Sequence, residues 1–92
     1  MTVYVIKKLE KEAEKLPTYI QQMLKEEITK LKAAKKLGDM ENVEKLKGID
    51  EPYYRLKFND YRLLLFYDSA SNTVEVRKLK HRKDAYKKHN LP

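Results

Sequence analysis

The spacing of hydrophobic residues divides this chain into a helical first half and a β-rich second half. Between residues 7 and 36, apolar residues recur every three or four positions, with lysine and glutamate between them. This period is typical of helices that bury one face. Pro17 separates two such stretches, because proline ends one helix and suits the first turn of the next. The pattern therefore predicts helices over residues 7–16 and 17–36.

Strands are predicted on both sides of these helices, where β-branched and aromatic residues alternate with polar ones or run together. The predicted strands cover residues 2–6, 53–58, 61–68 and 73–79. We expect a turn at 69–72, a polar irregular segment at 39–51 and a short last helix at 82–88. The predicted fold is α+β with the order β-α-α-β-β-β, in which two N-terminal helices pack on one face of a small antiparallel sheet.

The size and composition of the chain narrow the possible classes of protein. Ninety-two residues make one domain, which we expect to span residues 1–92. The sequence has no cysteine and two histidines, so we expect no disulfide, no metal site and no other cofactor. No stretch approaches the roughly 20 apolar residues of a membrane span, and we expect a cytoplasmic protein without a membrane partner.

Asn59 and Asp60 lie between two predicted strands and set the register of a hairpin. If they form a two-residue turn, Lys57 pairs with Arg62, and cross-strand partners share one face of the sheet. Arg55, Lys57 and Arg62 then emerge together on the face opposite the helices. Like charges opposite each other destabilise a sheet. Their gathering on one face therefore indicates an anionic ligand.

Positive charge is concentrated near the end of the sequence. Residues 77–92 contain seven basic residues and one acidic residue, which is +6 of the net charge of +7. Arg77 is expected to face outward from its strand, and Lys78 and Lys80 to mark where that strand leaves the sheet. A polyanion or an acidic protein is the expected partner of such a surface. The residues expected to form a cleft are Arg55, Lys57, Arg62, Arg77, His81, Arg82 and Tyr86.

Four segments of the sequence resemble the RelE/ParE superfamily of toxins from type II toxin–antitoxin systems, and the resemblance covers almost the whole chain. These segments are Leu46-Lys47-Gly48, Tyr54-Arg55-Leu56-Lys57, Asp60-Tyr61-Arg62-Leu63 and His81-Arg82-Lys83-Asp84-Ala85-Tyr86. The RelE branch has a fold like that of small microbial ribonucleases. It cleaves mRNA in the ribosomal A site and is silenced by a cognate antitoxin that wraps the toxin.

The resemblance implies a ribosome-dependent mRNA endoribonuclease that inhibits translation and forms a hetero-oligomer with its antitoxin. The basic and aromatic positions of the RelE branch match Arg55, Lys57, Arg62, Arg82 and Tyr86, with arginine in place of lysine at position 55. The residues expected to bind RNA around this site are Arg55, Arg77, Lys78, Lys80 and Lys83.

Cleavage of this kind uses the 2′-hydroxyl of the RNA as nucleophile, so it needs proton transfer and cations but no metal. The planar guanidinium groups of Arg62 and Arg82 match phosphate geometry. Two residues remain candidates for proton transfer. Histidine titrates near neutral pH, which favours His81, whereas Lys57 could serve if the neighbouring Arg55 and Arg62 disfavour its protonated form. Tyr86 could position the 2′-hydroxyl or stack on a base, and no carboxylate is expected to be well placed for proton transfer.

Two other functions remain open at this point. Members of one superfamily can share a fold and differ in function. A ParE-like chain would inhibit DNA gyrase by binding it, and a non-catalytic relative would only bind its antitoxin. The five basic and aromatic positions expected of the RelE branch are all occupied in this sequence, and ParE-like members are expected to lack some of them. This favours the endoribonuclease.

Overall fold

The computed structural model describes residues 1–48 and 52–85, with the backbone alone at residues 84 and 85. Most of the helices and strands lie where the hydrophobic pattern predicts them. In chain order they are β1 (Thr2–Val5), α1 (Lys7–Ala13), α2 (Thr18–Ala33), the 3-10 helix η1 (Leu37–Asp39), β2 (Val43–Lys45), β3 (Tyr53–Phe58), β4 (Tyr61–Asp68), β5 (Thr73–His81) and α3 (Arg82–Ala85).

Within the described residues, five strands form one sheet in the order β1-β5-β4-β3-β2. The prediction of a purely antiparallel sheet is wrong, because β1 pairs with β5 in parallel while the other neighbours are antiparallel. A parallel pair needs a long connection, and here everything between β1 and β5 provides it. Strand β2 also lies inside the segment that was expected to be irregular.

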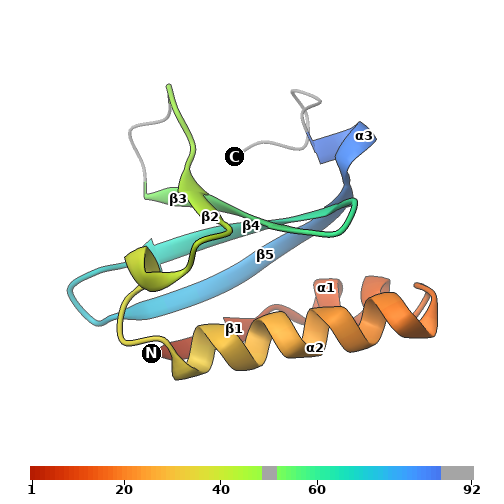
Figure 1. Ribbon diagram of the computed structural model, residues 1–92, viewed down its shortest axis with the longest axis horizontal. Helices are drawn as coiled ribbons and strands as arrows, with labels where there is room; N and C mark the ends of the chain where they lie inside the picture. Colours follow the sequence, from red (N-terminus) through yellow and green to blue (C-terminus); the bar gives the residue numbers. More distant parts are fainter. Residues whose placement is uncertain (49–51, 86–92) are drawn as a thin grey trace.

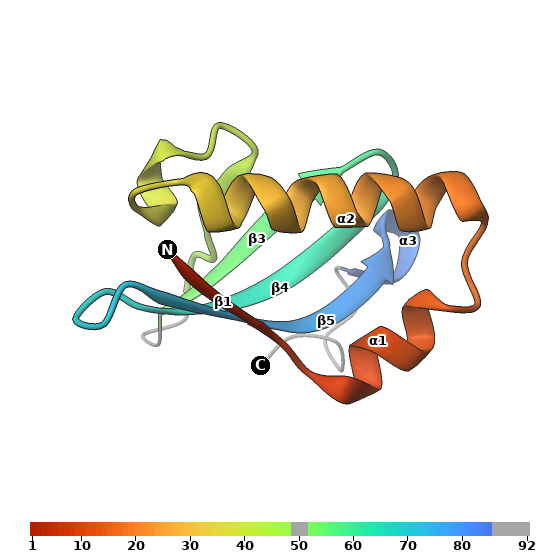
Figure 2. The same ribbon diagram turned by 90° about the horizontal axis from the view of Figure 1, so that it is seen from below.

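Helices α1 and α2 cover one face of the sheet, as predicted. Figure 1 shows them below the strands, with α3 at the opposite side of the sheet. Figure 2, seen from below, shows α2 running across β3 and β4 while α1 lies beyond the end of β1. None of the helices in residues 1–48 and 52–85 is long and apolar enough to cross a membrane.

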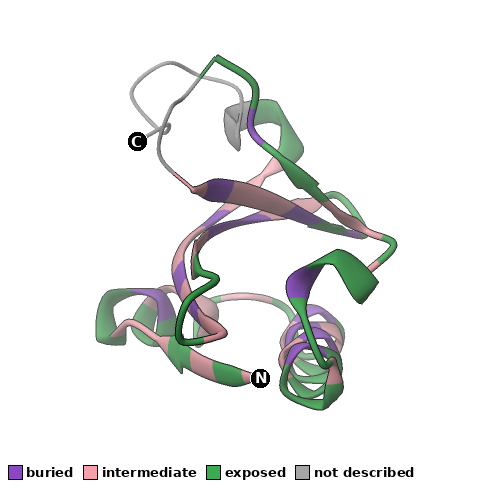
Figure 3. Cartoon of the chain, turned by 90° about the vertical axis from the view of Figure 1, so that its left-hand side faces the viewer, coloured by how far each residue is buried: buried purple, intermediate pink, exposed green. Residues whose placement is uncertain are grey.

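The main core lies between these helices and the sheet, where the purple segments in Figure 3 face one another. Its side chains come from the apolar stripe of each helix and from alternate positions of the strands. The fully buried members are Leu9, Ile20, Leu31, Leu37, Leu56, Leu63, Leu65, Val74 and Val76. A smaller cluster of Leu46, Tyr53, Leu64 and Phe66 lies on the other face of the sheet.

Helices α1 and α2 are both shorter than the predicted ranges. Helix α1 ends at Ala13 and α2 ends at Ala33, where the next residue is extended with φ −69° and ψ 142°. This change of direction brings Leu37 into the core, where it is 2% exposed. Helix α3 begins at Arg82 as predicted, and the rest of the predicted range, 86–88, lies outside the described residues.

Strand β5 is longer than predicted and contains an irregularity. Leu65 pairs with Val76 but Leu64 pairs with Lys78, so one strand contributes an extra residue, Arg77, at this point. Such a bulge changes which residues face each side. Lys78 and Lys80 were expected where the strand leaves the sheet. They instead lie within β5, and Lys80 pairs with Arg62.

Candidate functional site

The β3–β4 hairpin has the predicted register and gathers basic residues on the face of the sheet opposite α1 and α2. Lys57 pairs with Arg62, and Arg55 pairs with Leu64. The bulge in β5 adds its own basic residues to the same face. We call this surface the basic face, and its cations are Arg55, Lys57, Arg62, Arg77, Lys78 and Lys80.

The turn between β3 and β4 brings two arginines together. Asn59 adopts φ 52°, a left-handed conformation that asparagine tolerates. Arg62 Nη1 donates hydrogen bonds to the carbonyls of Asn59, at 3.1 Å, and Tyr61, at 2.8 Å. The Arg82 backbone N–H donates to the Asp60 carbonyl at 2.6 Å, and Arg82 Nε lies 3.8 Å from Asp60 Oδ1. One short turn therefore positions both predicted phosphate-binding arginines.

Arg62 is held in place with unused hydrogen-bonding capacity. Its Nε atom is buried and has no hydrogen-bond partner within the described part of the chain. A buried donor without a partner costs about 1–3 kcal/mol. Such a group in a native protein calls for an explanation, and a functional role is one of those known. The same side chain also stabilises the turn, so Arg62 has a structural role in addition to any role toward a ligand.

A carboxylate that sequence reasoning missed lies among the cations of the basic face. Glu44 is the cross-strand partner of Arg55 and forms ion pairs with Arg55 and with Lys57, the latter at 3.5 Å. Its hydrogen bond with Arg55, and then the charges of Arg55 and Lys57, lower the pKa of Glu44. Sequence reasoning missed Glu44 because it treated the segment that contains β2 as irregular.

Glu44 should compete with an anionic ligand for Arg55 and Lys57. We expect Glu44→Gln to raise the affinity for a single-stranded RNA oligonucleotide by about two- to fivefold, the range of an exposed ion pair. Fluorescence anisotropy at fixed salt would measure this. The control is Glu41→Gln, which removes one exposed negative charge before β2. Equal gains in both variants would show that only net charge matters.

The pH dependence of Glu44 has a definite sign. Because its pKa is lowered in the folded state, its contribution to stability is present above the unfolded pKa of about 4.3. That contribution is lost as pH falls through the lower folded value. Protonation also removes the negative charge that competes with RNA for Arg55 and Lys57, so RNA affinity should rise over the same acidic window. The rise should be smaller in Glu44→Gln, which anisotropy titrations between pH 3 and pH 6 would reveal.

Arg77 is committed to contacts within the protein. Its guanidinium carbon lies 4.3 Å from the centre of the Phe66 ring and 5.4 Å from that of Tyr53. Nη1 donates to the Tyr53 hydroxyl at 2.5 Å, and Nε donates to Glu75 at 2.8 Å. Stacking of this kind stabilises an arginine over an aromatic ring. Arg77 therefore covers the smaller apolar cluster as well as adding charge to the basic face.

His81 lies on the helix side of the sheet, away from Lys57. It pairs with Tyr61, which packs against the main core, and the two rings meet edge to face with centroids 5.4 Å apart. Its Nδ1 accepts a hydrogen bond from the Lys83 backbone N–H at 3.3 Å. Lys83 is exposed at the start of α3. Tyr86 lies outside the described residues, so its predicted place in the cleft stays a prediction.

A hollow of about 410 Å³ extends the cationic surface toward α1. Arg77, Lys78 and Lys80 line it together with Lys8, whose contribution the sequence did not reveal. Glu12 and Glu75 also lie on its wall. Lys8 is far from the other cations in the sequence, and only the packing of α1 beside β5 brings it here. The hollow can accept part of a polyanion that continues past the basic face.

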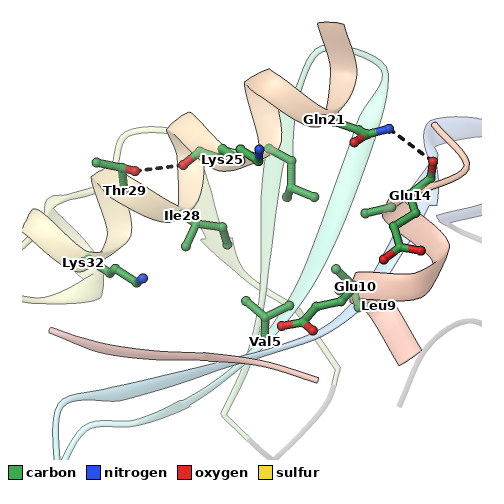
Figure 4. Close-up of a pocket in the computed structure, with 11 residues that line it drawn as sticks. Val5, Leu9, Glu10, Glu14, Gln21, Lys25, Ile28, Thr29 and Lys32 are labelled. Atoms are coloured by element: carbon green, nitrogen blue, oxygen red, sulfur yellow. Dashed lines mark hydrogen bonds between the residues drawn. The ribbon is translucent and has the colours of Figure 1, made fainter. Parts of the chain in front are cut away.

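The groove between α1, α2 and β1 has a different character (Figure 4). Its volume is about 630 Å³, and Val5, Leu9 and Ile28 form apolar parts of its lining. Glu10 and Glu14 line the α1 side, whereas Lys25 and Lys32 line the α2 side. Because its charges have both signs, this groove does not extend the cationic surface. The basic face and the β3–β4 turn are therefore the better candidate site.

Comparison with known proteins supports the fold. No protein-family model matches the chain, and no curated protein matches its sequence. Among solved structures, it is similar to a RelB–RelE antitoxin–toxin complex from Methanococcus jannaschii, with a TM-score of 0.74, 24% identity and coverage of 97% of this chain and 99% of that chain.

Two further structures give the same result. A RelE–RelB complex from the archaeon Pyrococcus horikoshii OT3 has a TM-score of 0.73, 24% identity and coverage of 88% and 93%. The isolated E. coli RelE toxin has a TM-score of 0.64, 20% identity and coverage of 87% and 82%. At these identities the similarity concerns the fold, and it confirms the RelE-like α+β architecture expected from the sequence.

Proposed function

We propose that this chain is the toxin of a toxin–antitoxin pair and that it cleaves mRNA on the ribosome as an endoribonuclease. The observation that carries the proposal is the convergence of Arg62 and Arg82 on one turn beside Lys57. It supports a site for a phosphodiester, because two guanidinium groups can share the charge of one phosphate. The RelE-like fold supports the same function by analogy.

In the proposed reaction, the 2′-oxygen attacks the adjacent phosphorus and the bond from phosphorus to the 5′-oxygen breaks. The products are a 2′,3′-cyclic phosphate and a 5′-hydroxyl. Arg62 and Arg82 stabilise the negative charge that develops on the phosphorane. Lys57 lies beside Arg62 in the cross-strand register, whereas His81 pairs with Tyr61 on the other face. This placement supports Lys57 over His81 as the acceptor of the 2′-hydroxyl proton. A proton from water goes to the leaving 5′-oxygen, because His81 lies on the other face of the sheet.

The RNA would lie along the basic face. Arg55, Lys78 and Lys80 would attract its phosphates there, and Lys83 would do so near α3. Tyr86 would position the 2′-hydroxyl or stack on a base. No metal takes part, since the cations supply the electrostatic stabilisation. The chain would act in the cytoplasm, where translating ribosomes provide the substrate.

The proposed partner is a cognate antitoxin of acidic or amphipathic character that forms a hetero-oligomer with this chain. A free basic face would expose the host to RNA cleavage, so the antitoxin should cover this face or displace the last helix. Complementary charge would favour fast association with such a partner.

The test is inducible expression of this chain, with Arg62→Ala as the comparison. We expect the unchanged chain to arrest growth and to produce new 5′-hydroxyl ends within translated mRNA, whereas untranslated copies of the same RNA stay intact. Arg62→Ala should show neither effect. Growth arrest with intact mRNA and altered DNA supercoiling would instead support a gyrase inhibitor. If neither RNA nor DNA changes, the chain is a non-catalytic, antitoxin-binding protein.

A further inference from the structure

Glu27 is a buried acid that the proposed reaction does not use. It lies on α2 and is 6% exposed, and no other charged residue in the described part of the chain is classed as buried. Burying a carboxylate is unfavourable unless it is paired or hydrogen-bonded. A hydrophobic residue would suit this position better if packing alone were needed. The partners of Glu27 therefore indicate why an acid lies here.

Its two oxygens have different partners. Oε2 accepts a hydrogen bond from Lys30 Nζ at 3.0 Å, and this ion pair raises the pKa of Lys30. Lys30 lies one helical turn away with its side chain 65% exposed, so this pair contributes little. Oε1 accepts a short hydrogen bond from Asn42 Nδ2. That contact joins α2 to the segment that enters β2.

Asn42 in turn holds the backbone of Lys57 at two points. The Lys57 N–H donates to the Asn42 carbonyl at 2.9 Å, and Asn42 Nδ2 donates to the Lys57 carbonyl at 2.9 Å. Lys57 is the last outward-facing residue of β3 before the turn. A shift of one residue in this strand would move its side chain to the opposite face. The hydrogen bonds of Asn42 therefore fix the face on which Lys57 emerges.

We propose that Glu27 is a positioning residue that sets the place of Lys57 through Asn42. Glu27 does not touch the RNA, and it acts from the helix layer on a residue of the basic face. A hollow of about 380 Å³ lined by Glu27, Asn42, Lys57 and Asn59 lies at this junction. The proposal rests on the proposed role of Lys57 in cleavage. It gives the contacts from Glu27 through Asn42 to Lys57 a function in catalysis.

The experiment compares four single variants and one double variant of the full chain. Glu27→Leu removes the acceptor for Asn42, Glu27→Gln keeps an acceptor oxygen without the charge, and Lys30→Ala removes only the exposed ion pair. Asn42→Ala, alone and combined with Glu27→Leu, tests whether Glu27 acts through Asn42. The first measurement is hydrogen exchange of the Lys57 amide by NMR, which needs no activity. The second is the single-turnover rate and half-saturation concentration for cleavage on translating ribosomes.

We expect Glu27→Leu to speed exchange of the Lys57 amide by about tenfold. It should lower the maximal cleavage rate by about 10- to 100-fold without changing the half-saturation concentration. Glu27→Gln should retain most of the rate, and Lys30→Ala should match the unchanged protein. The double variant should be no slower than its slower single variant, because both changes break the same chain of contacts.

Unchanged exchange of the Lys57 amide in Glu27→Leu would overturn the proposal. So would a fully additive effect in the double variant. If Glu27→Leu does not fold, Asn42→Ala and Glu27→Gln carry the test. If the unchanged protein cleaves no RNA, the proposed function fails, whereas the exchange measurement still decides whether Glu27 holds Lys57.

Discussion

Replacing Arg82 with alanine should lower the rate of mRNA cleavage by about 100-fold, the typical effect of losing one group that stabilises developing charge in a transition state. The protein should remain folded. The Arg82 side chain is 61% exposed, and its contact with Asp60 Oδ1 is long at 3.8 Å. The backbone hydrogen bond to the Asp60 carbonyl does not depend on the side chain. The measurement is the initial rate of cleavage in a reconstituted translation reaction, with thermal unfolding followed in parallel.

Two control variants separate phosphate geometry from charge. Arg82→Lys keeps the charge but loses the planar fork, so it should recover only part of the rate. Lys11→Ala removes an exposed positive charge on α1 and should leave the rate within about twofold, as for most surface substitutions. If Arg82→Ala and Lys11→Ala reduce cleavage equally, Arg82 contributes only to general attraction of RNA.

The largest effect on stability is expected at Leu63, in the middle of the central strand β4. Its side chain is fully buried in the main core at 0% exposure. Leu63→Ala should lower the free energy of unfolding by about 3–4 kcal/mol, because it removes buried methyl groups and leaves a cavity. For a domain of this size, the unfolding temperature should fall by about 15 °C. Urea denaturation would measure the loss, and we expect a lower midpoint with an unchanged m-value.

Leu64 provides the matched control, because it is the next residue and faces the other way. It belongs to the smaller cluster, which lies on the same face of the sheet as the basic residues, and is 9% exposed. Leu64→Ala should therefore lower the free energy of unfolding by about 2 kcal/mol, near the lower end for buried leucines. Equal losses in the two variants would mean that the smaller cluster supports the fold as strongly as the main core.

The hairpin of β3 and β4 could be predicted because its information is local. Two turn residues and the alternation of side chains were enough to pair Lys57 with Arg62, and the structure has the same pairing. The face of each basic residue on these two strands followed directly. The helices could be predicted as well, since an apolar stripe over several turns is a strong signal.

Other features depend on contacts that no local pattern encodes. Strand β2 is only three residues long, Val43–Lys45, and exists because β3 offers an edge for it. Missing β2 also meant missing Glu44 among the cations. The bulge beside Leu64 likewise depends on the pairing of β4 with β5. Because a bulge interrupts the alternation of side chains, the face on which Lys78 and Lys80 lie could not be predicted from the sequence pattern. The buried Glu27 lies on the apolar stripe of α2, three residues after Leu24 and four before Leu31, whereas its neighbour Glu26 is exposed.

The parallel pairing of β1 with β5 has a consequence for how the protein folds. It joins Thr2 to Thr73 and Val5 to Val76, so the first strand can take its place only after a very long loop has closed. Closing such a loop costs more chain entropy than forming a hairpin, and contacts between distant residues slow folding. We therefore expect the β3–β4 hairpin to form early and β1 to dock late. During synthesis, the earliest strand must wait for one of the last before the sheet is complete.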